Sequence, residues 1–162
     1  MNRLAAHLAE RKPRELRTTR LVAAPRELVW KVWTDPNHVG NWWGPDGFTT
    51  TTYEMDVRPG GVWRYDMHGP DGRDYPNFIR FLEVVAPERL VYVHGGDEHL
   101  AEPVSFRAAV TFADRGGSTF VVLRSTFASA EALARVVRDY HADIGAVQHL
   151  ANLAQYAEGM RA

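Results

Sequence analysis

The chain of 162 residues contains no cysteine, so a disulfide framework, a thiolate zinc site and a cysteine nucleophile are all excluded. Neither sign of charge dominates. The 19 basic and 20 acidic residues give a net charge of −1, which argues against a nucleic-acid-binding or polybasic membrane surface. No stretch reaches the ~18 apolar residues of a membrane helix, and Met1–Lys12 lacks the pattern of a secretion signal. We therefore expect a cytoplasmic protein with no nucleic-acid partner and no membrane insertion.

What the chain does contain is an unusual distribution of aromatic residues. Its length fits one domain of about 100–200 residues, and 45% apolar with 24% charged residues is ordinary for a globular protein. Among the seven Phe, six Tyr and five Trp, every Trp lies between positions 30 and 63. The composition therefore predicts an aromatic-rich core.

The first part of the chain predicts one strand and several short helices. Residues 2–12 carry Leu4 and Leu8 four apart and are followed by Pro13, which is typical of a short amphipathic helix. We therefore expect a helical extension over 1–13, followed by a single domain over 14–162. Residues 14–22 alternate as a strand, and helices are expected from Pro25 and over 35–41.

The middle of the chain predicts six strands separated by turns. Gly60-Gly61, Asp71-Gly72 and Gly116-Gly117 mark tight turns between them. The expected strands cover 49–57, 62–68, 78–85, 89–94, 104–113 and 118–126. Because the connections are short, these strands are expected to pair mostly antiparallel, and the strand at 14–22 brings the sheet to seven.

A long helix is expected to close the domain. Ser129 is placed to cap it, and apolar residues at helical spacing continue to about residue 158. One amphipathic helix on a strongly twisted antiparallel sheet defines an α+β domain with two layers. A curved sheet wrapped around one helix leaves room for a ligand unless large side chains fill it.

Several short motifs follow one another in the order found in a known superfamily. They are Ala24-Pro25, Val29-Trp30, Trp33-Thr34-Asp35-Pro36, Trp42-Trp43-Gly44-Pro45, Asp56–Gly61, Gly69–Gly72 and Leu82–Leu90, and then Gly145, Leu150 and Leu153 on the last helix. Over about residues 16–157 the chain resembles the START-like superfamily, also called SRPBCC, which has a Bet v-type helix-grip fold. It is most similar to the branch related to the activator of the 90-kDa heat-shock protein ATPase.

The resemblance implies a helix-grip fold with a cavity for a small hydrophobic molecule. It implies no single activity, because members include ligand carriers, polyketide cyclases, resistance proteins and chaperone regulators. The chain has Ile79 where this branch usually has Gly, and Gly145-Ala146 where it usually has Gly-Trp. Loss of an indole opposite the sheet is expected to leave volume, part of which Ile79 takes back.

Six residues are candidates for lining that cavity: Trp43, Trp63, Tyr65, Tyr92, His94 and Asp143. Trp63 and Tyr65 share one face of their strand, as do Tyr92 and His94. The aromatic residues could equally serve as core packing, and His94 as a buried, hydrogen-bonded histidine. Asp143 lies near the apolar stripe of the last helix, either solvated at its edge or facing the cavity with a partner.

Three functions remain open at this stage. The first is binding of a small hydrophobic or aromatic ligand between the sheet and the last helix, without a cofactor. The second is a cyclase or hydrolase that uses an inward His94–Asp143 pair. The third is a protein-interaction domain of the chaperone-activator kind, with a chaperone or a second copy of the chain as the candidate partner. No metal site is expected, because the spacing in residues 94–99 matches no zinc or calcium loop.

Overall fold

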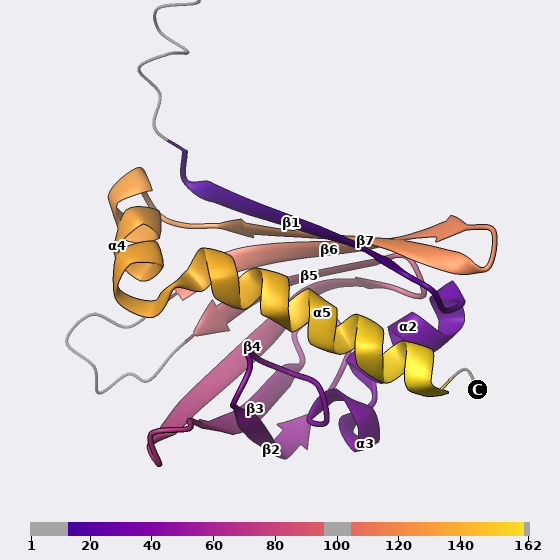
Figure 1. The fold of residues 1–162 in the computed structure, drawn as a ribbon, viewed down its shortest axis with the longest axis horizontal. Helices are drawn as coiled ribbons and strands as arrows, with labels where there is room; N and C mark the ends of the chain where they lie inside the picture. The colour runs from indigo at the N-terminus through magenta and orange to yellow at the C-terminus, as the bar shows by residue number, and fades with distance from the viewer. Residues whose placement is uncertain (1–12, 96–104, 161–162) are drawn as a thin grey trace, which may run out of the picture.

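The structure is a computed structural model that describes residues 13–95 and 105–160. A seven-stranded sheet in the order β1-β7-β6-β5-β4-β3-β2 forms one layer, with every described strand pair antiparallel, and helix α5 lies across it (Figure 1). The elements are β1 (Glu15–Val22), α2 (Arg26–Thr34), α3 (Pro36–Val39), β2 (Thr49–Met55), β3 (Val62–His68), β4 (Asp74–Val85), β5 (Arg89–Gly95), β6 (Ser105–Arg115), β7 (Ser118–Thr126), α4 (Ala130–Tyr140) and α5 (Ala142–Met160). The predicted α+β helix-grip fold is confirmed.

Local sequence explains where the early helices begin. Pro25 has an extended backbone immediately before α2, where its missing N–H costs no helical hydrogen bond. The Asp35 carboxylate accepts a hydrogen bond from the Asn37 N–H at 2.8 Å and so caps α3. These two short helices fill the space between β1 and β2, as the sequence predicts.

The predicted long helix over 129–158 is two helices. Ser129 does cap the first of them, since its hydroxyl accepts from the Ala132 N–H at 3.0 Å. The chain then breaks at His141, which adopts the left-handed conformation with φ 53° and ψ 44°. Because a helix cannot continue through such a residue, α5 starts afresh and its faces are set independently of α4.

The sheet curves around α5 with the help of irregular pairing. Register shifts occur between Thr52 and Glu54 on β2 and between Phe81 and Glu83 on β4, and bulges of this kind increase the local twist. Strand β4 also begins at Asp74, earlier than predicted, because residues 74–77 pair with β3 beyond the Gly69–Gly72 turn. The result is a concave face that holds the core.

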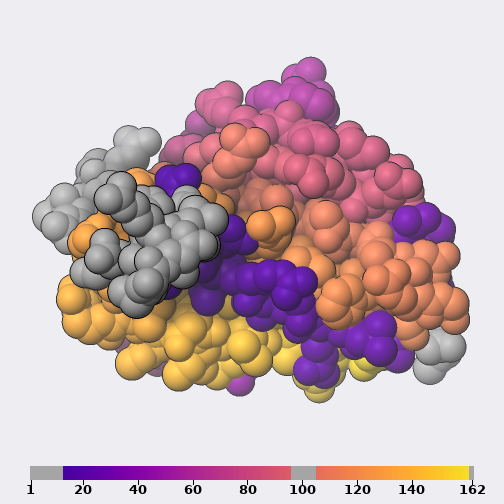
Figure 2. Space-filling model, turned by 90° about the horizontal axis from the view of Figure 1, so that it is seen from above, coloured from indigo at the N-terminus to yellow at the C-terminus, as the bar shows by residue number. Residues whose placement is uncertain are grey.

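The core has two unequal parts. The main cluster joins α2, α3, α5 and the concave face of the sheet, and includes Trp33, Trp63 and Leu153. A second cluster of Phe127, Leu133 and Val136 lies under α4. Figure 2 shows β1 running along the molecule between α5 and the later strands, which agrees with the close contact of α5 and β1.

One prediction falls largely outside this description. The helix expected over residues 2–12, and with it most of the extension over 1–13, lies outside the described residues. Within the described residues, no helix is both long enough and apolar enough to span a bilayer.

Candidate functional site

A cavity of about 300 Å³ lies between the first half of α5 and the concave face of the sheet. It is lined from the sheet by Leu16, Tyr65, Met67, Tyr92, His94, Phe106, Leu123, Ser125 and Phe127, from the segment before β2 by Trp43, Gly44 and Pro45, and from the helices by Tyr140, Ala142, Gly145, Ala146 and His149. Ligand sites run from about 300 to 1,000 Å³, so this cavity suits a small ligand.

Small residues on α5 explain why the space exists. Ala142, Gly145 and Ala146 fall on the helix face that meets the cavity. A methyl group built on Gly145 would meet only Pro45, at 3.7 Å, so even an added side-chain atom would not fill the gap. Ala146 also lines the cavity, as the sequence predicts.

Trp43 and Tyr65 form one wall of the cavity, and Trp63 supports them from behind. The Trp63 ring stacks on Tyr65 with 4.1 Å between centroids, and it meets Trp43 edge to face at 4.6 Å. Its indole N–H donates to the Thr52 hydroxyl at 3.1 Å. Trp63 is therefore absent from the lining, which corrects the prediction: strand parity gave the right face but not the position along the strand.

Two polar atoms in the lining are buried without a hydrogen-bond partner among the described residues. They are the Tyr65 hydroxyl and Nδ1 of His94. A third such atom, Nε of Arg26, lies on α2 outside the cavity. Buried polar groups are normally paired, so two orphans in one apolar cavity call for an explanation.

The electrostatics of the lining favour neutral groups. Burial lowers the pKa of His94 to about 4, and its ring stacks on Phe106 at 4.7 Å. Burial also raises the pKa of Tyr65, with a further rise from the neighbouring Tyr92. The Trp43 side chain opposes that rise in part, although no atom meets the Tyr65 hydroxyl with hydrogen-bond geometry. Tyr92 likewise has its pKa raised by burial.

His149 is a cavity residue that the sequence analysis did not single out. Its Nδ1 accepts a hydrogen bond from the Gly44 N–H at 3.0 Å, so the neutral ring must carry its proton on Nε2. Gly44 has φ 102°, and a Cβ there would meet Met67 at 2.6 Å, so glycine is required for this contact. Burial, with a smaller contribution from His94, lowers the pKa of His149 to about 3.

Asp143 does not reach the cavity, which corrects the prediction made for it. It is exposed in the first turn of α5 and lines a surface groove against β1 together with Arg17 and Val147. The break at His141 resets the helical phase, so spacing counted from α4 misplaces its side chain. The expected His94–Asp143 pair does not form.

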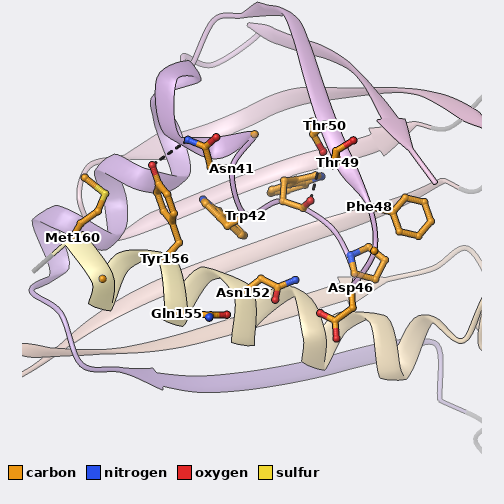
Figure 3. A pocket seen from close by; sticks show the side chains of 15 residues that line it. Asn41, Trp42, Asp46, Phe48, Thr49, Thr50, Asn152, Gln155, Tyr156 and Met160 are labelled. Carbon is orange, nitrogen blue, oxygen red and sulfur yellow. Dashed lines mark hydrogen bonds between the residues drawn. The ribbon is translucent and has the colours of Figure 1, made fainter. Parts of the chain in front are cut away.

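A larger hollow of about 960 Å³ opens on the surface at the far end of α5 (Figure 3). Asn41 donates to the Tyr156 hydroxyl at 3.1 Å across it, and Asn152 donates to the Gly44 carbonyl at 3.0 Å. Its described buried polar atoms are thus paired, unlike those of the smaller cavity. Within the described ranges, no three His, Asp or Glu side chains are grouped as metal ligands would be. The smaller cavity is therefore the candidate site.

The fold and the site define this protein as a helix-grip domain with a small interior cavity. Comparison with known proteins gives the family. The sequence profile of "Activator of Hsp90 ATPase homolog 1-like protein" matches residues 23–158, and the chain belongs to that family. None of the proteins with curated descriptions matches the chain.

Solved structures share this fold. Protein Ms6760 from Mycobacterium smegmatis is 28% identical, with a TM-score of 0.76 over 91% of this chain and 90% of that one. A protein from Arthrobacter aurescens is 23% identical, with a TM-score of 0.83 over 90% and 87%. DynU16, a protein in the dynemicin biosynthetic locus, is 20% identical, with a TM-score of 0.64 over 90% of this chain and 48% of that one. The last two show the fold alone.

Proposed function

We propose that this protein binds a small aromatic or hydrophobic ligand in the cavity under the first half of α5. The single observation that carries the proposal is the cavity itself: about 300 Å³ of mostly apolar lining with two buried polar atoms left unpaired. Burial of apolar ligand surface contributes about 25 cal/mol per Å² before ordering costs are subtracted. Trp43, Tyr65, Tyr92 and His94 are the proposed contacts among the residues singled out from sequence.

The proposal has a direct binding test. Two-ring probes, naphthalene and 2-naphthol, are titrated into the protein and followed by ligand-detected NMR and by tryptophan fluorescence, to which Trp43 should respond. The variant Ala146→Trp places an indole where the space now is. We expect that variant to lose probe binding by about tenfold or more while it keeps its fold, because the indole occupies the ligand volume.

A matched control comes from the next residue on the same helix. Val147 is 58% exposed, so Val147→Trp adds the same indole outside the cavity. This variant should bind both probes as the unaltered protein does. If neither probe binds the unaltered protein, or if both tryptophan variants bind equally well, ligand binding in this cavity is refuted.

Catalysis is less well supported by the geometry. With Asp143 exposed, the two titratable imidazoles of the lining are His94 and His149. Both have pKa values far below 7, so they are neutral at that pH and are weak bases. A carboxylate that could hold either ring as a charged acid is absent from the described lining. Binding without catalysis therefore ranks first.

A protein-interaction role is the second candidate, and one surface feature favours it. Ile144 and Val147 lie three residues apart on α5, Tyr140 ends α4 just before them, and each of the three side chains is more than half exposed. Exposed apolar side chains in a row are typical of a contact surface for another protein, here a chaperone or a second copy of this chain. Size-exclusion chromatography with light scattering, on the protein and on Ile144→Asp, tests self-association; an unchanged monomer in both excludes the homodimer.

A further inference from the structure

The lining of the cavity is polar at defined points yet carries no formal charge. Among the described residues that line it, none is Asp, Glu, Lys or Arg. Its polar side chains are three tyrosines, two histidines and one serine. A ligand that enters this space loses its water and receives hydrogen bonds or apolar contacts in return, but no opposite charge.

Two of these polar groups are available for a ligand. Within the part of the chain that the structure describes, the Tyr65 hydroxyl on β3 and Nδ1 of His94 on β5 are both buried and unpaired, while Nδ1 of His149 already accepts from the Gly44 N–H. Strand β4 separates β3 from β5, so the two free groups come from strands about 10 Å apart. A two-ring ligand is therefore large enough to present a polar substituent to one of them while its rings rest on the aromatic wall.

On the basis of the proposed function, we infer that the cavity selects an uncharged aromatic ligand bearing a hydroxyl or similar group, bound by Tyr65 or His94, and rejects the corresponding anion. Both free groups can donate or accept, since a phenol and a neutral imidazole each have both capacities. A neutral hydroxyl on the ligand therefore satisfies a group that is otherwise orphaned. A carboxylate in the same place would be buried without a counter-charge, which is far more costly.

Protonation of a histidine, which would supply the missing counter-charge, is also unfavourable. The pKa of His94 lies near 4, and a second imidazole, that of His149, lies close enough to lower its own pKa further by mutual repulsion. Stacking of His94 on Phe106 at 4.7 Å gives the ring an apolar neighbour rather than an acidic one. The same features that leave the cavity neutral thus also keep it neutral when an anion approaches.

The test compares three probes of nearly equal shape at pH 7: naphthalene, 2-naphthol and 2-naphthoate. A net hydrogen bond in a protein interior is worth about threefold to tenfold in affinity, so 2-naphthol should bind that much more tightly than naphthalene. The naphthoate anion should bind at least about tenfold more weakly than 2-naphthol. The measurements are dissociation constants from calorimetry or ligand-detected NMR.

Variants then locate the hydrogen bond. Tyr65→Phe and His94→Phe each remove one polar atom and keep a ring in place. The preference for 2-naphthol over naphthalene should fall in at least one of them and reverse in the double variant, because an unpaired buried hydroxyl is unfavourable. Tyr53→Phe removes the hydroxyl of a 64% exposed tyrosine outside the cavity and should leave the preference unchanged.

Each outcome has a distinct meaning. Tighter binding of 2-naphthoate than of 2-naphthol overturns the selectivity while the proposed ligand-binding function stands. Equal binding of naphthalene and 2-naphthol, or an unchanged preference in the double variant, overturns the assignment of Tyr65 and His94 as anchors. Failure of all three probes to bind refutes the proposed function and this selectivity together.

Discussion

The two halves of α5 meet the same sheet in opposite ways. In the second half, Leu150, Leu153, Ala154 and Ala157 are almost fully buried and pack in the main core. In the first half, Ala142, Gly145 and Ala146 leave the cavity open. One helix on one sheet thus produces both a packed core and a ligand space, and the size of its side chains decides which is formed.

The largest expected effect separates the two halves by their contribution to stability. Leu153→Ala, in the packed half, should lower the free energy of unfolding by about 2–5 kcal/mol. Leu123→Ala, on the cavity wall, removes the same atoms but should cost less, because one side of Leu123 already faces empty space. Urea unfolding monitored by circular dichroism measures both values. Equal losses would show that the cavity is filled by packing in solution.

A second prediction concerns the loss of stability at low pH, and it involves the two histidines that line the cavity. His94 and His149 have folded-state pKa values of about 4 and about 3, below the ordinary value of 6.5, so the unfolded chain takes up protons first. Stability should therefore fall as the pH drops below about 6.5, by up to about 1.4 kcal/mol per pH unit for each histidine. Unfolding free energies measured between pH 7 and pH 5 test this.

The control for this prediction is His94→Phe. It removes one of the two titrating groups and keeps a ring against Phe106, so the loss of stability with pH should be about half as steep. An unchanged slope in His94→Phe would mean that His94 is solvated in the folded protein. In that case the buried part of the cavity that His94 lines does not exist in solution.

The smallest expected effect is a change in stability of opposite sign when each of two tyrosines is replaced by phenylalanine. Tyr156, beside the packed half, has a hydroxyl bonded to Asn41 and to Nδ1 of His38 at 2.8 Å, so Tyr156→Phe should cost about 1 kcal/mol. The Tyr65 hydroxyl has no partner among the described residues, so Tyr65→Phe in the ligand-free protein should raise stability by about 1 kcal/mol. Thermal unfolding of both variants decides the point; destabilisation by Tyr65→Phe would reveal a partner for its hydroxyl.

Much of the fold follows from the sequence, because its signals are local. Turn glycines such as Gly60-Gly61 and Gly116-Gly117, the Ser129 cap and period-two alternation place the strands and helices within a few residues. The departures arise where local rules do not reach. The spacing of residues 129–158 does not indicate that His141 breaks the helix, because the left-handed residue that ends α4 is a histidine and not the usual glycine.

The candidate site was predictable in part for the same reason. Strand parity correctly brings Tyr65, Tyr92 and His94 to the concave face. It cannot say that Trp63 lies behind Tyr65 or that Asp143 turns outward once the helix restarts. His149 was missed, although Ala142, Gly145, Ala146 and His149 follow one another at helical spacing from the start of α5. That signal can be read only when the break at His141 is known.

The break at His141 also separates two helices that belong to different packing clusters. Helix α4 packs on its own small cluster of Phe127, Leu133 and Val136, whereas α5 belongs to the main core. A single residue joins them, so α4 can change length or sequence without shifting the register of α5. Tyr140 and Ala142 flank His141 and line the cavity. Such changes in α4 would therefore alter the shape of the cavity and leave the main core intact.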